Sequence, residues 1–395
     1  MDIVFAHSDD LVVPILVEWL DIVDIVRFDF ACASSVSSRE ALPRILALPQ
    51  AVFYNDKCLS NGFNRNVKGF IGWLVRRKMK LARVQVTKNM ASESQLVAEF
   101  ITLCGPALRR LDLVAYNSTI MTAALNNCHH IKELSIYNGE DIEQDAVFRS
   151  SSIEKFYLGG RVGDISNSIC IQFPNLKNLS VVGGGITDSI LLGILQHTST
   201  LQQIVLDEAL CLTETSFVAV AQYCRPLERL YVFDMTFPSA YLTKILACTP
   251  ELKLLELSNA LYGMDEKDLF EIVAANCPQI DTCTLNCCDG PPREAILQAF
   301  ISMLKRCVHL RSLKLDLCRF VTDEYLRAIA SHAKKMIHLS LLDCYISRAG
   351  VVEIAKHCRD LQYISISGGN GYSITDECKL LFPTQTRVHL DNDEA

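Results

Sequence analysis

The 395-residue sequence lacks several features that would assign it to a class at once. No apolar run approaches the roughly 18 residues of a membrane-spanning helix, and residues 1–7 lack the basic stretch that begins a secretory signal. Positive charge is not in excess either, because 38 Lys and Arg stand against 45 Asp and Glu. The net charge of −7 argues against a general nucleic-acid binder. We therefore expect a soluble protein of the cytoplasm, the nucleus or both, without a nucleic-acid or membrane partner.

The sequence also lacks the motifs of common catalytic sites. It contains no H-E-x-x-H zinc motif, no G-x-S-x-G nucleophile turn and no Walker phosphate loop. Residues 183–185 are three consecutive glycines, but the Gly-Lys-Ser/Thr of a phosphate loop does not follow them. We expect no enzymatic activity and no cofactor.

Cysteine, by contrast, is abundant, with 17 residues. Without a secretory signal, reduced thiols are expected rather than disulfides. Cys277, Cys283, Cys287 and Cys288 lie close together in the sequence, as zinc ligands often do. Three of the four, however, fall at recurring positions of a repeat that gives each a packing role, and Cys287 alone has none. We therefore expect no metal site.

An apolar pattern, L-x-x-L-x-L, recurs over roughly residues 81–390. From Leu81 to Leu361, eleven steps span 280 residues, a mean period near 25.5 that lies within the 20–29 residues of leucine-rich repeats. The alternation within each copy predicts a short strand with one buried face. The copies begin at Leu81, Leu108, Ile131, Ile153, Leu176, Leu201, Leu227, Leu252, Ile280, Leu310, Met336 and Leu361, with a last strand expected at Val388 and Leu390.

Between the strands, apolar residues recur at helical spacing. Phe217, Val220, Ala221 and Cys224 fall at i, i+3, i+4 and i+7, which predicts one apolar helix stripe. The last position of each stripe is always Cys, Thr or Ala, so we expect each helix to end in a tightly packed turn. The same spacing begins at Leu191, Leu242, Phe270, Phe300, Leu326 and Val351.

Alternating strands and helices of this period predict an α/β leucine-rich repeat solenoid. Its shape would be a horseshoe with parallel strands on the concave face and helices on the convex face. The segment Leu310-x-x-Leu313-x-Leu315-x-x-Cys318-x-x-Val321-Thr322-Asp323 resembles the cysteine-containing class of these repeats. The pattern fades in the copies at Ile131 and Ile153, whose turns are rich in Gly, Asn, Asp and Ser. We expect a repeat domain of about 12 repeats over 81–395, preceded by a helical linker or cap over 46–80.

Residues 1–45 do not fit the repeat and predict two short amphipathic helices. Ile15-Leu16, Leu20, Asp24-Ile25 and Ala31-Cys32 lie at offsets that resemble an F-box, although Pro14 is displaced and the late Trp is absent. The resemblance implies that the chain is the substrate receptor of a Skp1–cullin–F-box (SCF) ubiquitin ligase. It also implies a set of residues that contact a Skp1-like adaptor, namely Leu11, Ile15, Leu16, Leu20 and Ile25.

The alternative is that residues 11–32 only cap the open end of the solenoid, since terminal repeats must shield the apolar core. Trp19 and Phe28 would then be buried against the first repeats, and the chain would be an interaction scaffold without a ligase role. The two hypotheses differ in whether the apolar face of this segment is free or buried.

A binding surface is expected on the concave face, where alternation places every second strand residue. Aromatic residues there are Tyr137, Tyr157, Tyr231 and Phe233, and Arg229 lies beside them. An acidic stripe consists of Asp207, Glu208, Asp234, Glu256, Asp316 and Asp343. Because aromatic anchors supply much interface energy, we expect a protein or peptide partner with basic and apolar groups. The alternative is an ordinary solvated surface whose aromatic residues pack along the strands.

Overall fold

The computed structural model describes residues 13, 16, 24–27, 29, 42–48, 51–53, 67–137, 147–160, 170–260, 264–286, 291–368 and 376–390. The chain forms two compact units. The first comprises Met1–Leu179 and Gly185–Thr198, and the second comprises Ser180–Gly184 and Ser199–Ala395. The domain boundaries expected at residues 45 and 80 stay predictions.

A 13-stranded sheet contains a strand for every expected copy of the repeat. The strand pairs whose register is described are all parallel. Neighbouring strands follow chain order, except that β6 (Val147–Arg149) and β8 (Cys170–Gln172) do not belong to this sheet. The strands are β3 (Arg83–Val86), β4 (Arg110–Leu113), β5 (Glu133–Tyr137), β7 (Lys155–Gly159), β9 (Asn178–Val182), β10 (Gln203–Asp207), β11 (Arg229–Phe233), β12 (Leu254–Ser258), β13 (Thr282–Asn286), β14 (Ser312–Lys314), β15 (His338–Cys344), β16 (Tyr363–Gly368) and β17 (Arg387–Leu390).

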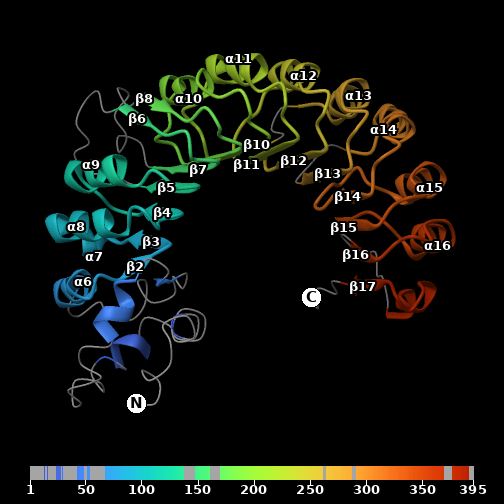
Figure 1. Ribbon diagram of the computed structural model, residues 1–395. Coiled ribbons are helices and arrows are strands. Elements are labelled where there is room, and N and C mark those ends of the chain that lie inside the picture. The colour runs from blue at the N-terminus through green and yellow to red at the C-terminus, as the bar shows by residue number, and fades with distance from the viewer. Residues whose placement is uncertain are drawn as a thin grey trace. The chain divides into compact units, whose positions relative to one another are not determined.

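All seven predicted helix stripes are confirmed as α10 to α16. Within each unit the described helices lie along one face of the sheet (Figure 1), and we call the other face the open face. None of the described helices is long and apolar enough to cross a membrane. The helices are α6 (Val67–Arg76), α7 (Lys88–Ala91), α8 (Ser94–Cys104), α9 (Ser118–Asn127), α10 (Asp188–Leu195), α11 (Glu214–Tyr223), α12 (Ser239–Cys248), α13 (Glu266–Asn276), α14 (Glu294–Arg306), α15 (Asp323–His332) and α16 (Arg348–His357), with the 3-10 helix η1 (Asp376–Leu381).

Four short strands of the described residues lie outside the main sheet. β1 (Val52–Phe53) pairs with β2 (Lys80–Leu81). In the irregular repeats, β6 (Val147–Arg149) pairs with β8 (Cys170–Gln172). Between β5 and β9 the described residues contain no helix. The described residues of this part of the chain therefore do not show the regular alternation of strand and helix.

The core lies between the sheet and the helices, because the alternating strand residues and the helix stripes face each other. Leu230 and Val232 of β11 are completely buried. At two of the stripe ends the small residue is a hydrogen-bond donor as well as a spacer. Thr198 Oγ1 donates to Phe173 O at 3.2 Å, and Cys307 Sγ donates to a backbone carbonyl of the preceding repeat at 3.6 Å. Burial raises the pKa of the Cys307 thiol to about 11, so it stays protonated and can donate.

The aromatic cluster of the second unit contains one unsatisfied polar atom. Phe270, Phe300, Phe320 and Tyr325 form edge-on or tilted pairs with centroids 5.1–5.9 Å apart. Tyr325 is 2% exposed, and its hydroxyl has no hydrogen-bond partner among the described residues. A buried polar group without a partner costs stability.

We expect Tyr325→Phe to stabilise the protein by about 1 kcal/mol, because it removes the unsatisfied hydroxyl and keeps the ring. Tyr325→Ala should destabilise it by about 3 kcal/mol or more, because it leaves a cavity. Thermal and urea unfolding of both variants would measure the two effects. A loss of stability in Tyr325→Phe would mean that the hydroxyl is satisfied.

Candidate functional site

The open face of the second unit presents its side chains in rows, because the parallel strands pair in register. Val205, Tyr231 and Glu256 occupy one row at successive strand centres. Asp207 and Phe233 occupy the next row at the strand ends. The rings of Tyr231 and Phe233 lie 6.2 Å apart on the same strand. Both aromatic side chains are half-buried, so each offers ring surface to a partner.

The residue after β10, β11 and β12 turns the backbone by adopting a left-handed conformation. Glu208 has φ 48° and Asp234 has φ 49°, and Asn259 and Asp343 repeat the turn with φ 51° and 52°. The N–H group of Glu208 donates to Phe233 O, and that of Asp234 donates to Ser258 O, each at 3.1 Å. The turn thus extends the backbone ladder by one residue and places an exposed carboxylate beside the strand end.

Asp207, Glu208 and Asp234 gather at the strand ends with no neutralising cation among the described residues. Partial burial, reinforced by the charges of Asp234 and Glu208, raises the pKa of Asp207. Burial also raises the pKa of Glu256, against the opposing charge of Lys314. Charge that is not neutralised inside the chain is available to a cationic partner.

The other edge of the strands is different, because its charges pair across repeats. In the second unit, Lys253 Nζ lies 3.1 Å from Glu228 Oε2. In the first unit, Glu154 accepts hydrogen bonds from Lys132 and Lys177 at 2.6 and 2.9 Å. These two bonds lower the pKa of Glu154 to about 2. Among the described residues, charges therefore pair at the strand starts, whereas Asp207, Glu208 and Asp234 have no ion pair at the strand ends.

We define the acidic–aromatic surface as the set of open-face residues around the ends of β10, β11 and β12. All of them belong to the second unit. Its apolar centre is flanked by carboxylates and one exposed Arg. The members are Val205, Asp207, Glu208, Arg229, Tyr231, Phe233, Asp234 and Glu256.

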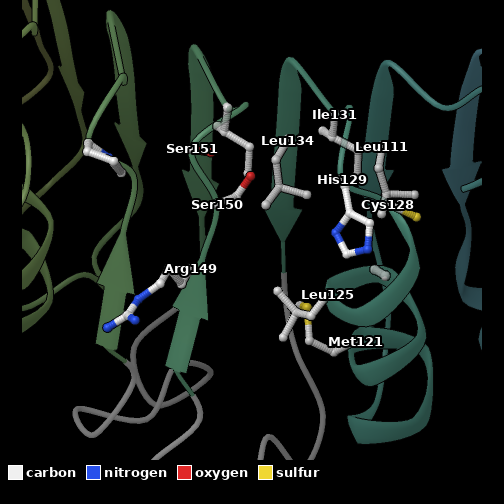
Figure 2. Close-up of a pocket in the computed structure, with 13 residues that line it drawn as sticks. Leu111, Met121, Leu125, Cys128, His129, Ile131, Leu134, Arg149, Ser150 and Ser151 are labelled. Atoms are coloured by element: carbon white, nitrogen blue, oxygen red, sulfur yellow. The ribbon is translucent and has the colours of Figure 1, made fainter. Parts of the chain in front are cut away.

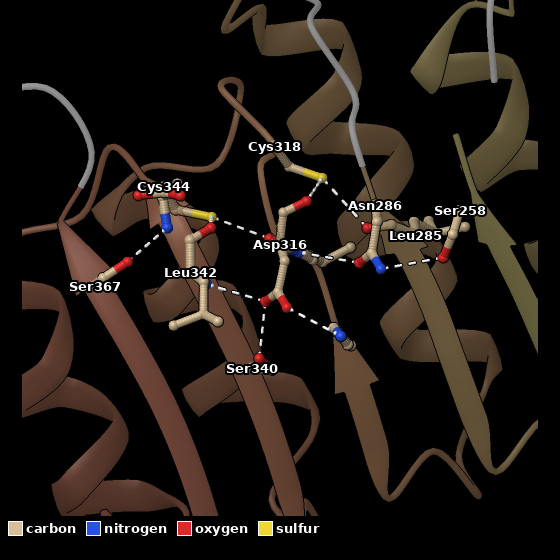
Figure 3. Close-up of polar contacts among 12 residues, drawn as sticks. Ser258, Leu285, Asn286, Asp316, Cys318, Ser340, Leu342, Cys344 and Ser367 are labelled. Carbon is tan, nitrogen blue, oxygen red and sulfur yellow. Dashed lines mark hydrogen bonds and ion pairs between the residues drawn. The ribbon is translucent and has the colours of Figure 1, made fainter. Parts of the chain in front are cut away.

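Asp316, which the acidic stripe predicts as a partner-binding residue, is instead a structural connector. It is 6% exposed, and its Oδ1 atom accepts hydrogen bonds from Ser340 Oγ at 2.8 Å and from the N–H group of Leu342 at 3.0 Å. Its Oδ2 atom lies 3.2 Å from Lys314 Nζ. Figure 3 shows this carboxylate between neighbouring strands. Internal bonds already use the carboxylate, and we leave Asp316 out of the surface.

Tyr137 and Tyr157 belong to the first unit and form a separate aromatic pair. Their ring centroids are 4.8 Å apart. Gly159 faces Tyr137 in the register, and a Cβ atom at Gly159 would lie only 2.8 Å from the Tyr137 ring. The missing side chain therefore lets the Tyr137 ring lie against the neighbouring strand. These two rings pack along the strands, as the alternative hypothesis describes.

Of the residues predicted to bind an adaptor, Leu16 and Ile25 are buried within the chain, with 3% and 0% of their surface exposed. Leu11, Ile15 and Leu20 lie outside the described residues. Trp19 and Phe28, the expected contacts of a cap, also lie outside them.

A buried polar contact joins the N-terminal segment to α6. Asp29 Oδ2 accepts hydrogen bonds from Trp73 Nε1 at 2.9 Å and from Arg77 at 2.9 and 3.1 Å. The Asp29 side chain is only 10% exposed and that of Arg77 is 30% exposed. Removing one partner of such a buried pair is costly. Asp29 is therefore bonded to the helix that precedes the first repeat.

The four cysteines that lie close together in the sequence are only partly within the described residues. Cys277 and Cys283 are completely buried, while Cys287 and Cys288 lie outside the described residues. The described part of the chain contains no group of three or more His, Cys, Asp or Glu that could hold a metal ion.

Sequence patterns missed two features of the molecule. Leu317 shares the left-handed turn at φ 56° and is 46% exposed, although nothing in a leucine signals such a turn. A pocket beside α9 in the first unit also has no motif. Its one sequence signal is the fading of the repeat at Ile131 and Ile153.

No family model matches the chain. Two solved structures with similar backbones are complexes. A chain of the TLR13–ssRNA13 complex is 13% identical over 79% of this chain, with a TM-score of 0.47. A chain of the Rad7 and Elc1 complex in yeast is 11% identical over 93% of this chain and 91% of that chain, with a TM-score of 0.46. The present chain covers 48% of the TLR13 chain. The chain has a leucine-rich repeat fold.

Proposed function

We propose that the protein is a protein-binding module whose acidic–aromatic surface binds a segment that combines Lys or Arg with apolar side chains. The observation that supports this most directly is the placement of Tyr231 and Phe233 beside carboxylates that have no ion-pair partner among the described residues. Aromatic side chains in partly buried positions supply much of the energy of protein interfaces.

Charge determines which partner suits this surface. Asp207, Glu208 and Asp234 would attract cationic side chains and repel the phosphates of nucleic acids. An Arg or Lys placed over the Tyr231 ring would gain cation–π attraction as well. Binding of a cation would lower the raised pKa of Asp207, so affinity should decrease as the pH falls and this carboxylate becomes protonated.

We further propose that the N-terminal segment links this module to an SCF-type ubiquitin ligase in the cytoplasm, the nucleus or both. The support is the F-box resemblance of residues 15–32. Because Leu16 and Ile25 are buried within the chain, the proposed adaptor contact rests on Leu11, Ile15 and Leu20.

The second candidate is a scaffold without a ligase link, in which the N-terminal segment is only a cap. The hydrogen bonds of Asp29 with Trp73 and Arg77 favour it, because they hold the segment against α6. The binding role of the acidic–aromatic surface is the same in both candidates.

A peptide display library selected on the wild-type protein should become enriched in Arg or Lys together with apolar residues. Asp207→Asn/Asp234→Asn should remove the preference for basic residues, and Tyr231→Ala should weaken the selected peptides about tenfold or more. Sequencing of the selected pool and fluorescence anisotropy would measure the two effects.

Glu228→Gln is the matched control for the library, because it also removes one carboxylate, directly before β11, but takes it from the paired edge. It should leave selection unchanged. Enrichment of acidic residues, or equal effects of Glu228→Gln and the double variant, would contradict the proposed surface.

Wild-type protein should bind a purified Skp1-like adaptor in a pull-down, and Ile15→Asp/Leu20→Asp should not, because charge opposes burial of an apolar contact. Arg27→Ala is the control, since this Arg is 76% exposed and belongs to the same segment. Circular dichroism would verify folding. A folded wild-type protein that does not bind the adaptor would leave the capped scaffold as the function.

A further inference from the structure

An exposed leucine occupies one of the left-handed turns at the strand ends of the second unit. Leu317 has φ 56°, and its N–H group donates to Leu342 O at 2.8 Å, just as that of Glu208 donates to Phe233 O. Every other residue with positive φ described in this unit lies at the same position of the repeat and is a glycine, an asparagine or an acidic residue. These residues are Gly183, Glu208, Asp234, Asn259 and Asp343.

Neither the backbone nor the core explains a leucine at this position. A positive φ is unfavourable for a bulky side chain, and glycine, asparagine and aspartate adopt it more readily. Core burial does not compensate for this strain, because 46% of the Leu317 surface is exposed. Strained residues persist where the surrounding structure imposes them, and they cluster at functional sites. The conformation of Leu317 therefore points to a role on the surface of the molecule.

Hydrogen bonds on both sides of Leu317 impose its conformation. The carboxylate of the preceding residue, Asp316, accepts a bond from the N–H group of Leu342 at 3.0 Å. The thiol of the following residue, Cys318, donates to Leu285 O at 3.3 Å. Figure 3 shows both bonds, which reach in opposite directions to the neighbouring repeats. The backbone that presents the Leu317 side chain is therefore held in place before any partner binds.

Leu317 lies along the same series of strand-end turns as two carboxylates of the acidic–aromatic surface, Glu208 and Asp234. β12 and β13 separate β14 from β11. Because neighbouring strands lie about 4.8 Å apart, roughly 14 Å separates Leu317 from Asp234 and roughly 19 Å separates it from Glu208. An extended peptide covers these distances with about four to six residues. One bound segment can therefore reach both the carboxylates and Leu317.

We propose that Leu317 is a second apolar anchor for the partner segment, and that it binds an apolar side chain about four to six residues from the basic side chains at Glu208 and Asp234. Leu342 is half-buried beside it and adds apolar surface. This inference rests on the proposed function of the acidic–aromatic surface, and it adds a spacing between the basic and apolar residues of the partner.

The probe is a randomised peptide display library, selected in parallel on the full wild-type chain and on Leu317→Asn. Wild-type protein should enrich peptides with an apolar residue about four to six positions from a basic one. Leu317→Asn should retain the enrichment of basic residues but lose that of the apolar residue at this spacing. It should also weaken the best wild-type peptide about tenfold in fluorescence anisotropy.

Urea unfolding separates a binding role from a packing role. Because asparagine adopts a positive φ more readily than leucine, Leu317→Asn should keep or raise the urea midpoint, whereas loss of an internal packing contact would lower it. Leu380→Asn is the matched control, since Leu380 is 86% exposed in the same unit and lies in the 3-10 helix η1. It should leave both the selected sequences and the peptide affinity unchanged.

The outcomes distinguish this proposal from the proposed function on which it rests. Basic enrichment with the same apolar spacing on wild type and Leu317→Asn would overturn the anchor role and leave the acidic–aromatic surface intact. A lower urea midpoint with unchanged peptide affinity would assign Leu317 to packing and overturn it as well. No basic enrichment on wild type would contradict the proposed function, and the anchor role would fall with it.

Discussion

The structure depends on one constraint, which is that a repeat can bury its apolar face only against its neighbours. Leu230 is completely buried because it pairs with Ile204 on one side and Leu255 on the other. The helix-end donors serve the same constraint, since Cys307 and Thr198 each bond to a carbonyl of the preceding repeat. Contacts between repeats therefore fix the strand register, and the register then decides which open-face side chains become neighbours.

The register sorts the charged residues into two kinds. At one edge of the strands, opposite charges face each other, as in Glu228 and Lys253, and such pairs neutralise one another while contributing little net stability at a solvated surface. At the other edge, the left-handed turns bring carboxylates together with no cation between them. A cationic partner would complement these carboxylates, and in the proposed function the neighbouring rings of Tyr231 and Phe233 would supply the apolar half of the binding surface.

The sequence predicted the strands and helices of the repeats well. The alternation of the strands and the helical spacing both follow from burial, and each repeat contains both patterns. The sequence also predicted the aromatic and acidic residues of the open face from the same alternation. The sequence could not show the structural role of Asp316, because that role depends on hydrogen bonds from Ser340 and Leu342 in the next strand. Nor could the sequence predict the pocket beside α9 (Figure 2), because no motif marks its lining residues. The turn at Leu317 could not be predicted either, because the residue type does not favour a positive φ and only its place in the repeat imposes one.

The most direct test is a carboxyl NMR titration of Asp207 in the free protein. We expect its midpoint to lie above the ordinary aspartate range, because burial and the charges of Asp234 and Glu208 oppose ionisation. Since the folded-state pKa is raised, ionisation should lower stability as the pH rises through that midpoint. Asp234→Asn should bring the midpoint down, and Glu228→Gln should not move it. A midpoint at or below the ordinary range would mean that a cation of the chain already pairs with Asp207, and the acidic–aromatic surface would not be free for a basic partner.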